Sequence, residues 1–169
     1  MKRFKVAVRP RPSDITGVAK LAGLLALALI VPSIGLDQQF TGPMVNALLL
    51  ISAVVVGLPG AIMVGALPSL VALARGTLPL PMAVMVPYII FGNAALVGVF
   101  FQLHRRNYWL ALVPAAIVKF GLLFFAVTYM VTVPPALAGM MQWPQLYTAL
   151  LGGVIAWVVL GIGRLRLNR

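Results

Sequence analysis

The fold of this chain is decided by residues 108–133, which read YWLALVPAAIVKFGLLFFAVTYMVTV. A helix needs about 20 mostly apolar residues to cross the hydrocarbon core of a bilayer. The stretch exceeds that length, and Lys119 is the only charged residue in it. It therefore predicts a helix that spans a membrane.

The rest of the chain has the same character. Of its 169 residues, 62% are hydrophobic and 9% are charged, whereas about a quarter of an ordinary soluble domain is charged. A soluble domain of this size could not bury so much apolar surface. We therefore expect one all-α domain, a polytopic bundle of about six transmembrane helices. The expected spans are 17–36, 43–56, a third that follows a turn at 57–60 and runs to 74, 82–103, 108–133 and 144–162.

Basic residues predict the orientation of the bundle. The net charge is +11, but the basic residues gather at helix ends, which is typical of membrane orientation and not of nucleic-acid binding. Five precede the first span, two lie between the fourth and fifth, and three follow the sixth, whereas the opposite loops hold only Arg75. We expect residues 1–16 and 164–169 to be basic cytoplasmic tails on either side of a transmembrane domain at 17–163. The first span is predicted to remain uncleaved because it is too long for a signal peptide and no small-residue cleavage site follows it.

The sequence offers no catalytic constellation. Its only acids are Asp14 and Asp37, its only histidine is His104, and it has no cysteine. Paired carboxylates, a Ser-His-Asp triad and a metal cluster therefore cannot be assembled. We expect no enzyme activity, no catalytic residue, no metal site and no cofactor. No phosphate-binding loop is present either, so we expect that the chain cannot hydrolyse ATP alone and that any energy would have to come from a partner.

A few polar residues at membrane depth are the candidate substrate-binding residues. An ammonium at mid-span costs at least about 2.5 kcal/mol, so Lys119 either snorkels to an interface or meets a carbonyl or anionic group of a ligand. The asparagines in spans are candidates too, although asparagine often joins helices to one another. Lipid headgroup contact and the aromatic belt are the alternatives for the candidates near the outer boundary. The full set is Lys119, Asn93, Asn46, Arg75, Tyr88 and Trp143.

The first span carries small residues at helical spacing. Ala22 and Ala26 lie four residues apart on one face, and Ala19 and Gly23 repeat the spacing beside them. Small residues at this spacing allow a second helix to approach closely. The face serves either packing within this chain or docking of another subunit.

These features resemble the substrate-binding S components of energy-coupling factor (ECF) transporters. The resemblance covers the size, the six spans, the basic cytoplasmic ends and the alanine-rich first helix, and it is most specific at GPMVNALLL (42–50) and FGNAALV (91–97). It implies a multi-pass protein of the cell membrane that binds a vitamin or other small micronutrient from the outside. It also implies a transmembrane coupling subunit, docked at the positions of Ala22 and Ala26, and separate ATPase subunits as partners.

The alternative is a non-transporting anchor or scaffold subunit of a larger membrane complex. An outward cavity lined by Asn46, Asn93 and Lys119 would favour substrate capture. A solid core in which those polar groups all bond to each other would favour the anchor. The substrate stays open, because no residue set marks riboflavin, thiamine or biotin binding.

The charge distribution makes a testable prediction about topology. Reporter domains fused in the loop near Arg75 and after Arg169 should report opposite sides of the membrane, because ten basic residues flank one side and one flanks the other. Protease accessibility in sealed vesicles is the measurement. Finding both reporters on one side would defeat the six-span topology.

Overall fold

The computed structural model describes residues 15–76 and 80–167, with side chains up to residue 162. Those residues form helices and turns and contain no strand. The elements are α1 (Ile15–Ser33), α2 (Gln38–Val55), α3 (Gly57–Ala74), α4 (Leu80–Ala83), α5 (Val86–Leu103), α6 (Tyr108–Phe125), the π-helix η1 (Ala126–Met130), α7 (Pro135–Met140) and α8 (Trp143–Leu167).

Six helical segments in the described chain are long and apolar enough to cross a membrane. They correspond to α1, α2, α3, α5, α6 continued by η1, and α7 with α8, and their mean hydropathy lies between 1.3 and 2.3. Large apolar side chains such as Leu110, Ile117 and Phe125 of the fifth segment point outward and are exposed, as expected where lipid is the solvent. The prediction of an all-α polytopic bundle is confirmed.

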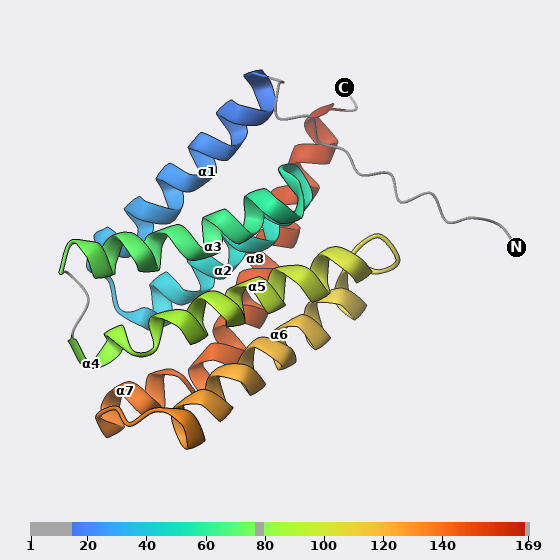
Figure 1. Ribbon diagram of the computed structural model, residues 1–169. Coiled ribbons are helices and arrows are strands. Elements are labelled where there is room, and N and C mark those ends of the chain that lie inside the picture. Colours follow the sequence, from blue (N-terminus) through green and yellow to red (C-terminus); the bar gives the residue numbers. More distant parts are fainter. Residues whose placement is uncertain (1–14, 77–79, 168–169) are drawn as a thin grey trace, which may run out of the picture.

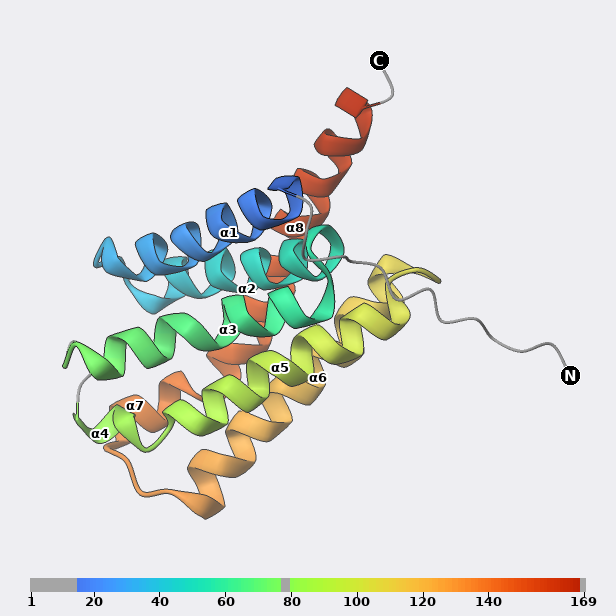
Figure 2. The ribbon, with the colours of Figure 1, turned by 45° about the horizontal axis from the view of Figure 1, so that its top comes forward.

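Five of the long helices close into a ring. α2 packs against α3, α3 against α5, α5 against α6, α6 against α8, and α8 against α2 (Figures 1 and 2). α1 is the exception, because it contacts α2 and α3 from outside the ring. Only Ala28 and Val31 of α1 are buried. The ring therefore makes the core, and α1 is attached to it along one side.

The two ends of the bundle carry different connections. The start of α1, the turn between α5 and α6 and the last turns of α8 lie at one end, whereas the α1–α2 turn, α4 and α7 lie at the other (Figures 1 and 2). With an even number of spans, the first span must start at the same end of the bundle at which the last span finishes, as is seen here. Residues 1–14 of the predicted tail 1–16, and residues 168–169 of the predicted tail 164–169, lie outside the described residues. Which end faces the cytoplasm stays a prediction.

Several helix boundaries differ from those expected. α2 begins at Gln38 and not at Pro43, because the backbone N–H groups of Phe40 and Thr41 already donate to the Asp37 carbonyl, at 2.9 and 3.0 Å. The expected turn at 57–60 is helical from Gly57, whose φ of +85° lets the chain reverse at Val56. α3 continues through Pro68, as a membrane bundle permits.

Other differences lie in the second half of the chain. The span expected at 82–103 is divided between α4 and α5, and the span expected at 108–133 ends in a π-helical turn at Met130. The loop expected between the last two spans contains α7, and α8 extends to Leu167 through part of the expected tail. In each case hydropathy located the apolar span, but it did not give the helix ends and breaks. These depend on contacts with neighbouring segments, which a sequence pattern does not report.

Glycine allows α8 to lie directly against α2. A Cβ on Gly152 would lie 2.6 Å from the Cβ of Asn46 and 2.7 Å from the Pro43 carbonyl oxygen. Backbone cannot move away from such a contact as a flexible side chain can. The small residue is therefore what sets the distance between these two helices.

A matched pair of variants tests this contact. Gly152→Ala should lower the free energy of unfolding by about 1–3 kcal/mol, the usual cost of overfilling a packed site. Gly161→Ala in the same helix, where a Cβ would meet nothing within 4 Å, should be neutral or stabilising by up to about 1 kcal/mol because alanine is the better helix former. Unfolding of both variants in mixed micelles is the measurement. Equal stabilities would mean that the α2–α8 contact is looser than described.

Candidate functional site

A cavity of about 410 Å³ lies inside the half of the bundle that carries α4 and α7. This volume falls within the range of about 300–1,000 Å³ typical of small-molecule sites. Side chains from every long helix and from both short helices line it: Pro32, Leu36, Gln38, Thr41, Gly42, Val45, Asn46, Gly65, Pro68, Ser69, Ala72, Met82, Ile89, Asn93, Lys119, Met140, Met141 and Gln145. Lys119, Asn46 and Asn93, which the sequence analysis singled out on three different spans, meet at this cavity.

Lys119 is the most unusual residue of the cavity wall. It lies in the middle of α6 on the face that buries Ala115, Ala116 and Leu123 inside the ring, and its side chain is 4% exposed. Its Nζ donates to Oδ1 of Asn46 on α2 at 2.6 Å. The snorkelling alternative is therefore wrong, because the side chain crosses the interior and does not reach an interface.

The bonds beyond Asn46 are long. Its Nδ2 donates to Oγ1 of Thr148 at 3.4 Å, and that hydroxyl donates to the carbonyl of Gln145, also at 3.4 Å. Hydrogen bonds with N–H donors in proteins are usually 2.7–3.2 Å long. The Asn46 amide is thus held firmly by Lys119 and only loosely by α8.

No acid neutralises Lys119. Among the described residues Asp37 is the only acid, and it is exposed at the position just before α2; Asp14 lies outside them. Lys119 is also the only charged side chain that lines the described cavity. The wall therefore presents one positive charge, with Asn46 as the hydrogen-bonding partner that the structure gives it.

Asn93 combines the two roles considered for it. Its Nδ2 donates to the Gly65 carbonyl at 2.9 Å and so joins α5 to α3, and the residue also lines the cavity. Gly65 lies three residues before Pro68, next to the carbonyl of Val64, which a proline at 68 leaves without its helical donor. Asn93 thus supports α3 close to the point where its hydrogen bonding is interrupted.

Two glutamines of the cavity wall bond to the end of α7. Gln38 at the start of α2 and Gln145 at the start of α8 both donate to the carbonyl of Met140, at 3.4 and 3.0 Å. The end of α7 is in this way joined to α2 and to α8.

The other predicted binding residues lie elsewhere. Arg75 is exposed at the end of α3. Trp143 is 62% exposed, and its ring lies 5.0 Å from that of Phe120. Neither lines the cavity.

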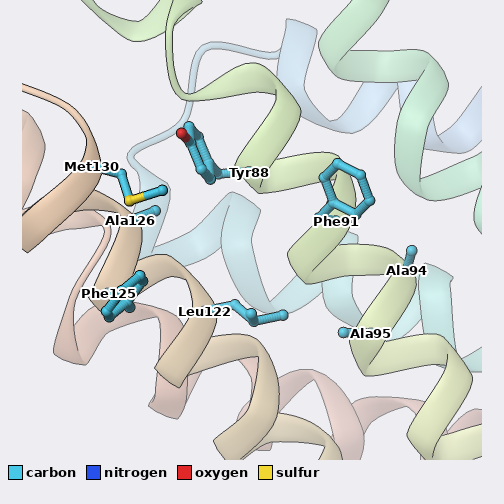
Figure 3. Close-up of a pocket in the computed structure, with 8 residues that line it drawn as sticks. All are labelled: Tyr88, Phe91, Ala94, Ala95, Leu122, Phe125, Ala126 and Met130. Carbon is cyan, nitrogen blue, oxygen red and sulfur yellow. The ribbon is translucent and has the colours of Figure 1, made fainter.

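Tyr88 lines a second depression, which is different in kind (Figure 3). This groove of about 500 Å³ lies between α5 and the α6–η1 segment, and its lining is Tyr88, Phe91, Ala94, Ala95, Leu122, Phe125, Ala126 and Met130. Apart from the Tyr88 hydroxyl it offers no polar side chain. Phe91, Phe125 and Met130 are exposed, so the groove belongs to the outer, lipid-facing surface and has no group that would orient a polar ligand.

The small face of α1 is exposed in the part of the chain that the structure describes. Ala22 and Ala26 are exposed, and a Cβ on Gly23 would meet nothing within 4 Å. The helix uses other positions, around Ala28 and Val31, to contact the ring. Ala22 and Ala26 are accordingly available to a partner.

Sequence reasoning missed several residues of the cavity wall, namely Gln38, Thr41, Ser69, Gln145 and the methionines at 82, 140 and 141. One signal could have found part of this set. Gln145, Thr148 and Gly152 fall at helical spacing on one face of α8, and this is the face that meets Asn46. The remainder comes from short segments whose position only the ring determines.

Comparisons of the chain with models of protein families, with curated proteins and with solved structures give no match. A function for this chain must therefore be inferred from the chemistry of its cavity.

The Lys119–Asn46 pair can be tested by a double-mutant cycle. Asn46→Ala should lower the free energy of unfolding by about 1.5–3 kcal/mol, because it takes the acceptor from a buried ammonium. In a Lys119→Met background the same change should cost at least about 1 kcal/mol less, because no buried charge is then left without its partner. Unfolding in mixed micelles measures all four proteins. Additive effects within about 0.5 kcal/mol would show that the two side chains are not coupled.

Proposed function

We propose that this protein is the membrane-embedded substrate-capture subunit of an ATP-driven importer of the ECF type. In this proposal it binds a vitamin or other small micronutrient in the cavity, from the outside. The observation that carries the proposal is a buried lysine on the wall of a cavity large enough for a small molecule, with no acid beside it among the residues that the structure describes.

The cost of burying Lys119 supports a functional role. An ammonium inside a span is expensive, and a well-packed apolar residue of similar size is often neutral or stabilising in the same place. A chain that needed only a stable bundle would therefore gain nothing from lysine here. A ligand with an anionic or carbonyl group gains a charge-assisted hydrogen bond from it.

The position of the cavity supports capture from outside. It lies at the end of the bundle that carries α4 and α7, opposite the α5–α6 turn with Arg105 and Arg106. If the basic end is cytoplasmic, as the charge bias predicts, the cavity lies in the outer half.

The exposed small face of α1 supports docking of a coupling subunit. α1 lies outside the ring, so a partner helix could contact Ala22 and Ala26 without disturbing the cavity. The resemblance to ECF S components assigns the same two positions to this contact. The partners in the proposal are a transmembrane coupling subunit and ATPase subunits, which supply the energy.

A non-transporting anchor or scaffold is the second candidate. It is favoured by the bonds that Lys119 and Asn93 make within the chain. It gives no role, however, to the cavity that both side chains line. The combination of cavity and unneutralised charge favours substrate capture.

Crossed variants test the proposal. Lys119→Met should weaken uptake, or binding of the small molecule that co-purifies from native membranes, by about tenfold or more, because a lost contact worth about 1.4 kcal/mol is a factor of ten. Association with the coupling subunit should be unchanged. Ala26→Leu should do the reverse, since a large side chain prevents close helix approach, and Ala22→Leu should act in the same way.

The control for the docking face is Ala74→Leu, an exposed alanine at the end of α3, which should affect neither property. Thermal stability in detergent is measured beside each assay. Unchanged ligand binding in the folded Lys119→Met variant would show that Lys119 is not part of the binding site. A native complex without coupling or ATPase subunits would favour the anchor.

A further inference from the structure

We infer that the cavity takes an aliphatic monocarboxylate, with its carboxylate on Lys119 and Asn46 and its hydrocarbon body along the methionine, proline and leucine side chains of the wall. The inference rests on the proposed function and specifies its substrate class. Charge, hydrogen-bonding geometry and the composition of the wall each contribute to it.

The charge of the wall favours a single negative charge on the ligand. Lys119 is the only charged side chain that lines the cavity in the described part of the chain. A carboxylate carries one charge and makes the occupied site neutral, whereas a phosphate group brings about −1.5 to −2 and leaves an excess in a poorly solvated interior. A neutral ligand leaves the positive charge of the ammonium uncompensated. The monoanion is the best match.

The hydrogen-bonding groups fit the two oxygens of a carboxylate. The Lys119 ammonium has three N–H donors, and the structure commits one of them to Asn46. The bond from Asn46 Nδ2 to Thr148 is long at 3.4 Å, so little is lost when that N–H turns to a ligand. One carboxylate oxygen can then accept from Lys119 and the other from Asn46, while Asn46 Oδ1 still accepts from Lys119.

The remainder of the wall suits a flexible chain better than a flat ring. The apolar lining consists of Pro32, Leu36, Val45, Pro68, Ala72, Met82, Ile89, Met140 and Met141, and no aromatic side chain lines the cavity in the described residues. An aromatic heterocycle would find no ring to stack on. Methionines adapt their shape to an irregular apolar neighbour, and three of them line the cavity.

A series of probes on the full-length protein in lipid nanodiscs tests the inference. Calorimetric titration with octanoate, octanamide, octyl phosphate and 2-naphthoate separates charge, headgroup and body, and empty nanodiscs correct for partition into lipid. Octanoate should bind at least tenfold more tightly than each of the other three. This comparison uses the unaltered chain, so it does not depend on the folding of any variant.

Two lysine variants locate the binding. In Lys119→Met the affinity for octanoate should fall to within about twofold of that for octanamide. Lys20→Met, which removes an exposed lysine of α1, is the matched control and should leave the affinity unchanged. Equal effects of the two substitutions would place octanoate outside the cavity and overturn the inference.

The remaining outcomes separate this inference from the proposed function. If octanamide, octyl phosphate or 2-naphthoate binds as tightly as octanoate, or no probe binds while another small molecule is retained in a way that needs Lys119, the substrate class is wrong and the capture function stands. If no probe binds and the protein purified from native membranes retains no small molecule, both are overturned.

Discussion

The central constraint on this bundle is an ammonium group held away from water in the middle of a span. Lys119 is 4% exposed inside the ring, and the described part of the chain places no acid beside it. Polar but uncharged groups must therefore stabilise its charge. The structure provides one such interaction, the 2.6 Å hydrogen bond from Lys119 Nζ to Asn46 Oδ1. This bond joins α6 to α2 at the wall of the cavity. The need to stabilise one desolvated charge thus affects both the packing of the interior and its chemistry.

The ring is what makes such a site possible. Because each of its five helices has two neighbours in the ring, a side chain that points inward is shielded from lipid on all sides. Glycines at the helix contacts, Gly152 against Asn46 and Gly65 against Asn93, bring the backbones close enough for short side chains to bridge them. α1 contributes Pro32, close to its C-terminal end, to the cavity wall. Its small residues Ala22 and Ala26 do not line the cavity, so this part of the helix could contact a partner without touching the cavity.

The two depressions of the bundle show why volume alone does not identify a site. The larger one, between α5 and the α6–η1 segment, is lined by apolar side chains and by Tyr88 (Figure 3). The smaller one is lined by residues from every long helix and contains one charged side chain, two asparagines and two glutamines. A polar group in a poorly solvated interior discriminates between ligands, because an unmatched ligand leaves it without compensation. An apolar groove in lipid has no comparable means of selection.

The sequence by itself determined the fold class and the unusual residues. Hydropathy is a property of each segment alone. The spans, such as 108–133, and the isolated charge of Lys119 could therefore be recognised without knowledge of the tertiary structure. The small residues of α1 could be found but not interpreted, since the same spacing serves internal and external contacts. The tertiary structure was needed to show that Ala22 and Ala26 face outward. It brings Lys119, Asn46 and Asn93 to one cavity, which Arg75, Tyr88 and Trp143 do not line. It also places two glutamines where both donate to the Met140 carbonyl of α7. These outcomes depend on which helices are neighbours and how each is rotated. Periodicity cannot supply that information in spans that are apolar on nearly every face.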